Sequence, residues 1–251
     1  MKKKLSAIVS SLIIAACLAS CSDSSAAPGS SSQSQPQTSE TSSQADPSSG
    51  KCGENAQWQL DDSGVLKITG SGEMSAMYAG AAPWYAVREK IKKAEIENGI
   101  SSISAGAFSG CVNLEQAVIP DSVKTIGKSA FYNCGLKQIE IPNSVESLGE
   151  CVFWDCGKLE SAKIGSGVKA LEYNAFCKCR KLKSISLSQG LERIGDCAFE
   201  YCDSLKSITI PDSVTSFGGN VFPTGETVIS GSKGSAAETF ANKYGYKFEA
   251  V

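Results

Sequence analysis

Apolar residues recur at fixed intervals through the middle of the chain. Six segments each open on Leu or Ile and then place apolar residues at offsets 3, 5, 9, 12, 16 and 17, with Cys usually at offset 20. The six opening residues, which lie 23, 22, 23, 23 and 23 positions apart, are Ile91, Leu114, Leu136, Leu159, Leu182 and Leu205. A pattern with this period is typical of a solenoid, because each unit buries its apolar face only against its neighbours. We therefore predict a repeat solenoid of six coils over residues 91–225.

Each coil is predicted to contain one short strand. Offsets 3 and 5 are two residues apart, so both side chains point to the same side of an extended chain. Three copies place Pro at offset 6, as at Pro120, which ends the strand because proline has no N–H for a ladder. The pattern favours a mainly β fold in which parallel strands alternate with short turns or helical pieces. The Phe residues at offset 17 should stack as a column inside the coils: Phe108, Phe131, Phe153, Phe176, Phe199 and Phe222.

Both ends of such a stack need a cap, since an open coil would expose its core. In the N-terminal cap, residues 51–90, the pairs Trp58/Leu60 and Leu66/Ile68 alternate on either side of a Gly-containing turn. This alternation predicts a β-hairpin.

The C-terminal cap, residues 226–251, is predicted to be a helix followed by a strand. Ser235 and Glu238 have the spacing of a capping box. An apolar stripe of helical period follows, formed by Ala237, Phe240, Ala241 and Tyr244. Gly245 should end the helix. The residues that then alternate like a last strand are Tyr246, Phe248 and Ala250.

Residues 1–20 have the pattern of a lipoprotein signal peptide. Three lysines precede an apolar stretch that is short for a membrane span. The sequence Leu18-Ala-Ser-Cys21 resembles a bacterial lipobox, and this resemblance implies that Cys21 carries a lipid anchor. An ordinary signal peptide, cleaved after an Ala-x-Ala-like site, is the alternative. Residues 21–50 should form a disordered tether, because 22–50 contain twelve Ser and no aromatic residue, Lys or Arg.

Charge and composition exclude several kinds of activity. Without the three lysines of the signal segment, 21 basic residues face 26 acidic ones, a net charge of −5. This balance argues against nucleic acid as a partner. The chain has no His, which removes Ser–His and Cys–His nucleophile pairs and most zinc catalysis. We predict no catalytic residue, no cofactor and no metal site, and hence a protein that is not an enzyme.

Five cysteines share offset 20: Cys111, Cys134, Cys156, Cys179 and Cys202. Because free Cys is among the most buried residue types, we predict an inward ladder of small side chains. Disulfides or a metal site are the alternative. The parallel direction of the side chains and their odd number favour free thiols, and Cys177 with Cys179 lacks a second close pair for a tetrahedral site.

Two surfaces are candidates for ligand binding. Offsets 2 and 4 of the strands point outward and form a polar row without rings, which includes Gln116, Gln138, Glu140 and Lys163. This face suits a protein or peptide better than a sugar, and a merely solvated face is the alternative. The second surface follows the Phe column and carries Tyr132, Trp154, Tyr173 and Tyr201. Such rings are enriched at binding hot spots and stack on sugars, unless they only cover the turns beneath them.

The repeat pattern L-x-x-I-x-I-P-x-S-V-x-x-I-G-x-x-A-F-x-x-C resembles the BspA-like leucine-rich repeat family of bacterial surface proteins. The resemblance covers residues 91–225, and the Trp58-Gln-Leu60 and Ala-Pro-Trp84 segments are also similar to the family. It implies a leucine-rich repeat solenoid that acts as a non-catalytic binding or adhesion module for protein or glycan partners, lipid-anchored at the bacterial cell surface. A structural or scaffold component of the cell envelope is the alternative, followed by a thiol redox or metal-binding protein.

Overall fold

The computed structural model describes residues 48–251 except 77, 79 and 224–226. A compact unit spans Ala45–Val251, and the buried apolar residues of the described chain lie between Cys52 and Ala241. This unit therefore has a hydrophobic core of its own, which is the property expected of a domain that folds independently. The predicted signal segment 1–20, the predicted lipidation site Cys21 and the tether up to residue 47 lie outside the described residues.

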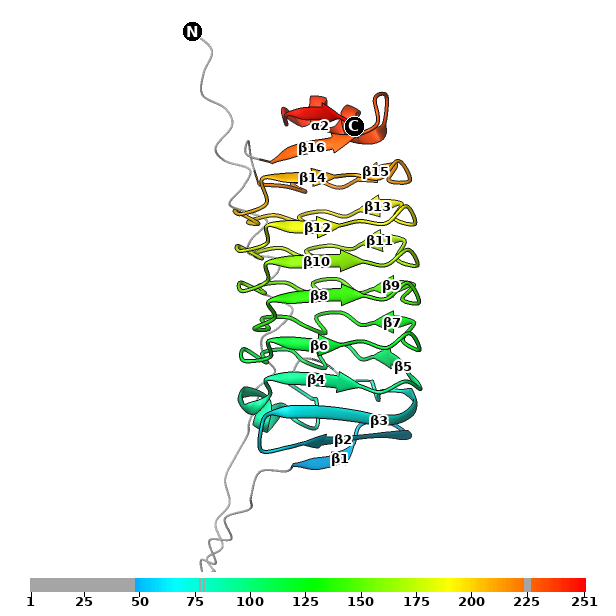
Figure 1. Ribbon diagram of the computed structural model, residues 1–251, viewed down its shortest axis with the longest axis vertical. Coiled ribbons are helices and arrows are strands. Elements are labelled where there is room, and N and C mark those ends of the chain that lie inside the picture. Colours follow the sequence, from blue (N-terminus) through cyan, green and yellow to red (C-terminus); the bar gives the residue numbers. More distant parts are fainter. Residues whose placement is uncertain (1–47, 77, 79, 224–226) are drawn as a thin grey trace, which may run out of the picture. The chain divides into compact units, whose positions relative to one another are not determined.

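Parallel strands form one side of the coil stack (Figure 1). Ala162 pairs with Ile139 in the coil before it and with Ile185 in the coil after it, so equivalent offsets of successive repeats lie side by side. This confirms the predicted solenoid. The strands of this front side are β3 (Val65–Glu73), β4 (Lys93–Ile96), β6 (Gln116–Val118), β8 (Gln138–Ile141), β10 (Ser161–Ile164), β12 (Ser184–Ser186), β14 (Ser207–Thr209), β16 (Val228–Gly231) and β17 (Phe248–Ala250).

A second parallel ladder, which the apolar pattern does not predict, forms another side of each coil. The first of its six strands covers offsets 9–12 and the other five cover offsets 11 and 12, where the pattern indicated only a return path. Strands of two residues are too short to show an alternation of apolar and polar positions. The strands are β5 (Ile100–Ile103), β7 (Thr125–Ile126), β9 (Ser147–Leu148), β11 (Ala170–Leu171), β13 (Arg193–Ile194) and β15 (Ser216–Phe217).

The third side of each coil is a turn that carries Phe into the core. The N–H of Phe131 donates to the carbonyl oxygen of Val152 in the next coil at 2.9 Å, and the equivalent bond recurs along the stack. Residues at offsets 15 and 19 bracket this turn with positive φ. In the first repeat both are glycines, Gly106 and Gly110. In the next four repeats they are Ser129, Asn133, Cys151, Asp155, Asn174, Lys178, Cys197 and Tyr201.

The predicted phenylalanine column is confirmed. The six rings are at most 2% exposed, and neighbouring rings stack with centroids 5.0–5.6 Å apart. The column continues into both caps, through Trp84 at 5.8 Å from Phe108 and through Tyr246 at 5.9 Å from Phe222. The caps and the repeats therefore share one continuous core.

The N-terminal cap contains the predicted hairpin. β2 (Asn55–Leu60) runs antiparallel to β3, with Trp58 opposite Ile68. The Asp61 carboxylate accepts N–H bonds from Ser63 and Val65, both at 2.9 Å, and holds the turn. A further strand, β1 (Ser49–Lys51), pairs with the open edge of β2. The predicted end of the tether at residue 50 therefore lies two residues too far along the chain. The polar segment has no strand pattern of its own, but it pairs with the otherwise open edge of β2.

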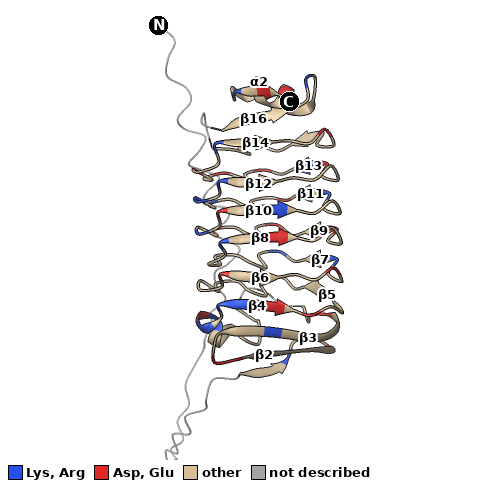
Figure 2. Ribbon diagram, viewed as in Figure 1, with Lys and Arg blue, Asp and Glu red and all other residues tan. Residues whose placement is uncertain are grey.

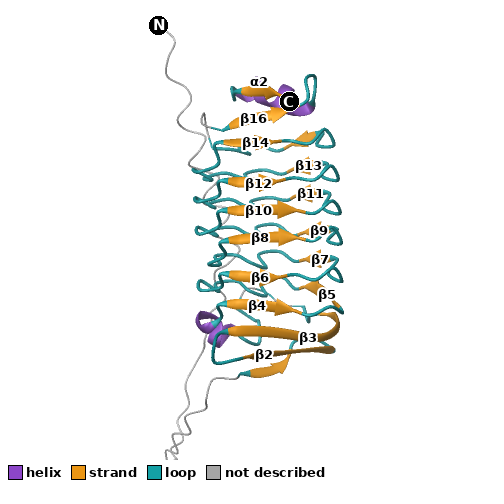
Figure 3. Ribbon diagram, in the orientation of Figure 1, coloured by secondary structure: helices purple, strands orange, loops and turns teal. Residues whose placement is uncertain are grey.

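A short 3₁₀ helix, η1 (Tyr85–Lys90), completes this cap and was not predicted. Trp84 precedes it and takes the position that Phe has in later coils. Its Nε1 donates to the carbonyl oxygen of Ala107 at 2.7 Å. Helices occur only at the two ends of the described stack (Figure 3), so the fold is mainly β.

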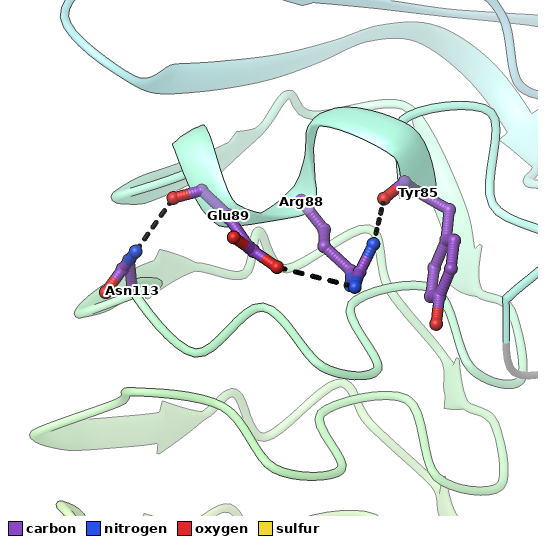
Figure 4. A network of polar contacts seen from close by, with 4 residues as sticks. All are labelled: Tyr85, Arg88, Glu89 and Asn113. Carbon is purple, nitrogen blue, oxygen red and sulfur yellow. Dashed lines mark hydrogen bonds and ion pairs between the residues drawn. The ribbon is translucent and has the colours of Figure 1, made fainter.

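Polar contacts tie η1 to the first repeat (Figure 4). Asn113 Nδ2 donates to the carbonyl oxygen of Glu89 at 2.8 Å. Within η1, Arg88 donates to the carbonyl oxygen of Tyr85 at 2.9 Å and pairs with the Glu89 carboxylate at 3.5 Å. The cap is thus held to the repeats by hydrogen bonds as well as by the shared core.

The C-terminal cap is a helix followed by a strand, as predicted. In α2 (Ala236–Tyr244), Ser235 Oγ accepts the N–H of Glu238 at 3.3 Å, and Gly245 ends the helix with φ 79°. The Glu238 carboxylate accepts the N–H of Gly234 at 2.5 Å. The predicted apolar stripe is wrong at Tyr244, which is 50% exposed. Its ring packs against the Phe240 ring, with the two centroids 4.8 Å apart, and leaves its other side to solvent.

Candidate functional site

The outward positions of the front strands form one polar surface, as the strand period predicts. In β8 and β10, offsets 2 and 4 are exposed or partly exposed, whereas the residues between them are buried. In β6 the outer positions are again the exposed ones. We call this surface the front face and define it by Gln116, Val118, Gln138, Glu140, Ser161 and Lys163. All four polar residues predicted for this face are thus brought together.

A hollow of about 290 Å³ lies on the front face and is lined by residues 116–118, 138–140 and 161–163. Two amides, one hydroxyl and one ion pair line it. Lys163 Nζ lies 2.6 Å from Glu140 Oε1, and both side chains are about two-thirds exposed (62% and 67%). Val118, 49% exposed, supplies an apolar spot within this otherwise polar row. The hollow is therefore able to offer donors, acceptors and one apolar contact to a ligand.

A second hollow, of about 640 Å³, adjoins the first where the front strands begin. The two hollows share Gln116, Gln138 and Ser161. The rest of its lining is charged and consists of Lys92, Lys93, Glu115, Lys137 and Glu160. These positions stand at or near offset 1, where the apolar pattern of the repeat gives no signal.

Charges alternate in sign along offset 1 from Lys92 to Lys183, after which Lys206 repeats the positive sign. Figure 2 shows the alternation at the starts of β6, β8, β10 and β12. Lys137 Nζ lies 2.7 Å from Glu115, and Lys183 Nζ lies 2.7 Å from Glu160. Hydrogen bonds from these lysines lower the pKa of the Glu115 and Glu160 carboxyls. The signal in the sequence was the change of sign at one fixed offset of the repeat.

The aromatic residues predicted as a second surface do not form a single exposed patch. Tyr132 and Trp154 lie 5.3 Å apart and are half-buried against each other. Lys178 Nζ lies 5.6 Å from the Trp154 ring. Tyr201, two coils further along, is 37% exposed, and the Arg180 guanidinium lies 6.0 Å from its ring.

Tyr173, the fourth predicted ring, is partly buried on the same side of the coils. The rings thus line the outside of the turns in successive coils, with basic side chains over two of them. They cover the turns at least in part.

The five cysteines at offset 20 are buried, as predicted, and the nine cysteines in the described residues are free thiols. Burial raises the pKa of Cys111 and of Cys156 to about 12. A thiolate is the reactive form of cysteine, so these thiols are poorly suited to redox chemistry at neutral pH. Within the described residues, no three acidic or thiol side chains converge as a metal ion would require.

None of the helices in the described part of the chain has the length and apolar character needed to cross a membrane.

Comparison with known proteins identifies the repeats. The model of the BspA type leucine rich repeat region matches residues 88–227 in six copies. No curated protein matches the chain.

Among solved structures, a leucine-rich repeat protein from T. pallidum is 22% identical, covering 78% of this chain and 95% of its own, with a TM-score of 0.49. A leucine-rich repeat protein from Eubacterium ventriosum is 21% identical, covering 73% of this chain and 72% of its own, with a TM-score of 0.38. A leucine rich cell surface protein from Faecalibacterium prausnitzii is 17% identical, covering 79% and 93%, with a TM-score of 0.31. The family match spans more than half of the residues in six consecutive copies, and the chain therefore belongs to the BspA-type leucine-rich repeat family.

Proposed function

We propose that the chain is a non-catalytic module that binds proteins at a bacterial cell surface through its front face. The observation that carries this proposal is the polar hollow at the centre of that face. Its amides and its exposed Glu140–Lys163 pair offer the mixed donors and acceptors that a protein surface can match. The family membership supports the same role, since repeat solenoids present extended binding surfaces.

A protein partner is favoured over a neutral sugar by the chemistry of the lining. None of the residues that line the two hollows is aromatic, so a sugar ring would find no face on which to stack. The front strands are spaced by about 4.8 Å, and six of them extend over roughly 24 Å. This length accommodates several residues of an extended or helical partner segment.

Anchoring to the cell surface is part of the same proposal. Cleavage before Cys21 and acylation of its thiol would attach the chain to the membrane, and two or more acyl chains give a stable anchor. Mass spectrometry of the mature protein tests this step: a lipid-modified Cys21 is expected, and an unmodified N-terminus elsewhere contradicts it.

The binding role is tested with immobilised residues 45–251 and a panel of purified extracellular matrix and cell-wall proteins. Replacing Gln116, Gln138, Glu140 and Lys163 together by Ala should abolish capture while leaving the melting temperature unchanged. The matched control replaces four exposed charges of the second ladder by Ala, namely Lys124, Glu146, Lys169 and Glu192, and should retain capture. Equal capture by both variants would rule out the front face. Failure to capture any protein would favour a scaffold role.

The aromatic edge is a second candidate surface, because Lys178 and Arg180 place cations over Trp154 and Tyr201. Replacing Tyr132 and Trp154 together by Ser, in the same assay, separates it from the front face. Loss of capture in this variant alone would assign binding to the edge.

A further inference from the structure

Charges on neighbouring coils are matched in most positions of the stack. At offset 10, Lys124 faces Glu146 at 3.8 Å and Lys169 faces Glu192 at 3.4 Å. The offset-1 column described above alternates in the same way from Lys92 to Lys183. Because equivalent positions of successive coils lie about 4.8 Å apart, alternation places each charge beside one of opposite sign. The stack thus avoids like charges on neighbouring coils at these offsets, except where Lys206 follows Lys183.

Offset 22 departs from this rule. Lys158 and Lys181 occupy it in successive repeats, and both side chains are exposed. Across the described residues, neither lysine makes a salt bridge, and Lys158 Nζ donates only to the carbonyl oxygen of Val112 at 3.5 Å. Two like charges on adjacent coils repel each other, so the fold gains nothing from this pair. An external anion would remove the repulsion.

The two lysines lie beside the charged hollow. Each stands two residues before a member of the offset-1 column, Lys158 before Glu160 and Lys181 before Lys183. The backbone of that column is fixed by hydrogen bonds between coils, including Glu160 N–H to the carbonyl oxygen of Lys137 at 2.8 Å. Lys158 and Lys181 are also close enough to Glu115 and Glu160, respectively, to help lower the pKa of those carboxyls.

We call Lys137, Lys158, Lys181 and Lys183 the lysine row. Glu115 and Glu160 neutralise Lys137 and Lys183. Lys158 and Lys181 therefore leave an excess of two positive charges next to a hollow of about 640 Å³.

We propose that the protein partner of the front face presents a short acidic segment, and that this segment docks in the charged hollow with its carboxylates on the lysine row. This inference rests on the proposed function and adds the chemistry of the partner. Gln116 and Gln138 in the hollow donate N–H bonds to the carboxylates or to the backbone of the segment.

A short acidic segment suits the site better than a long polyanion. The whole chain has a net charge of −2, so a long anionic polymer would be repelled away from the row, whereas a few carboxylates meet only the local positive excess. An anionic sugar would again find no ring on which to stack among the residues lining the hollow.

The test measures binding of a fluorescein-labelled octaglutamate peptide to residues 45–251 by fluorescence anisotropy in 20 mM NaCl. Octaglutamate should bind saturably and more weakly in 150 mM NaCl, and octaglutamine should not bind. The double substitution Lys158→Gln with Lys181→Gln should weaken binding at least threefold, in the range of exposed charge pairs. The matched control, Lys124→Gln with Lys169→Gln, removes the same charge from the second ladder and should leave binding unchanged.

Three outcomes would overturn the inference: no saturable binding of octaglutamate, equal weakening by both double variants, or equally tight binding of an oligogalacturonate of the same length. Failure of the inference is separable from failure of the proposed function. If capture depends on the front face but octaglutamate does not bind, only the inference of an acidic partner segment is rejected. Octaglutamate binding through the lysine row, together with no captured protein, removes the proposed function.

Discussion

At the scale of single residues, the cysteine at offset 20 does more than fill space. Its Sγ lies 3.0–3.2 Å from the carbonyl oxygen of the Phe in the preceding coil, in the four coils that begin at Leu114, Leu136, Leu159 and Leu182. The thiol therefore supplies a weak donor inside an apolar core. The sequence indicates a small apolar residue at this offset, whereas the donor role follows only from the position of the Phe carbonyl.

This role predicts a difference between two cysteines of equal burial. Cys156 donates to the carbonyl oxygen of Phe131, whereas Cys111 stands first in the ladder and, in the described part of the chain, has no such Phe before it. Both lose similar packing on substitution by Ala. We expect Cys156→Ala to lower the free energy of unfolding by about 0.5–1.5 kcal/mol more than Cys111→Ala. Urea unfolding of residues 45–251 measures both, and equal losses would reduce the thiol to a space-filling role.

The buried thiols also predict how stability depends on pH. The pKa of Cys156 is raised by burial to about 12, whereas an unfolded thiol has a pKa of about 8.5. Above the unfolded value, the unfolded chain releases protons that the native state retains, so the free energy of unfolding falls as pH rises. Urea midpoints should therefore decrease between about pH 8.5 and 9.5, and less steeply in Cys156→Ala. A midpoint constant over this range would contradict the thiol contribution.

The phenylalanine column predicts a large effect for a single ring in its middle. Phe153 is fully buried between Phe131 and Phe176, so Phe153→Ala leaves a cavity that the neighbouring coils cannot close. We expect a loss of about 3–5 kcal/mol in the free energy of unfolding. The control Val118→Ala, on the front face, should change it by less than about 0.5 kcal/mol. A melting curve unchanged by Phe153→Ala would refute the stacked column.

At the scale of elements, the sequence predicts structure where a period is visible. The front strands, the hairpin and the capped helix each show a period of apolar residues, and the structure contains all three elements. The second ladder and η1 show no such period. Elements of two to six residues are too short to have a pattern of their own, and neighbouring coils stabilise them. The front face followed from strand alternation. The charged hollow was not predicted, because its lining includes the charged residues at offset 1, whose alternation is visible only when the repeats are aligned with one another.

The turn of each coil predicts a specific backbone effect. Asn133 at offset 19 has φ 51°, a conformation that costs most L-residues about 1–2 kcal/mol and β-branched ones more. Asn133→Val should therefore destabilise residues 45–251 by at least about 1 kcal/mol, and Asn133→Gly should be nearly neutral. Thermal melts of the two variants check this order. Equal stability of the two would show that the turn does not impose this φ.

At the scale of the whole molecule, the alternation of charge determines which coils can lie next to each other without repulsion between like charges. Each exposed pair contributes little to stability. A shift of the stack by one coil, however, turns every pair of opposite charges along an alternating column into a pair of like charges. Deletion of repeat 4, residues 159–181, illustrates this effect. It keeps the phenylalanine column continuous, but it places Lys137 beside Lys183 and Glu146 beside Glu192.

Exchanging two charges should rescue the shortened chain. Lys183→Glu with Glu192→Lys restores opposite neighbours without changing length or net charge, and it should raise the melting temperature of the shortened chain by about 2–6 °C. In the full chain the same exchange places a second carboxylate beside Glu160 and a second ammonium beside Lys169, so the melting temperature should fall. Both shifts should disappear in 1 M NaCl, where the screening length is about 3 Å. If the exchange changes the melting temperature in the same direction in both chains, strand propensity or packing of the two residues, rather than the pairing of charges between coils, is the cause.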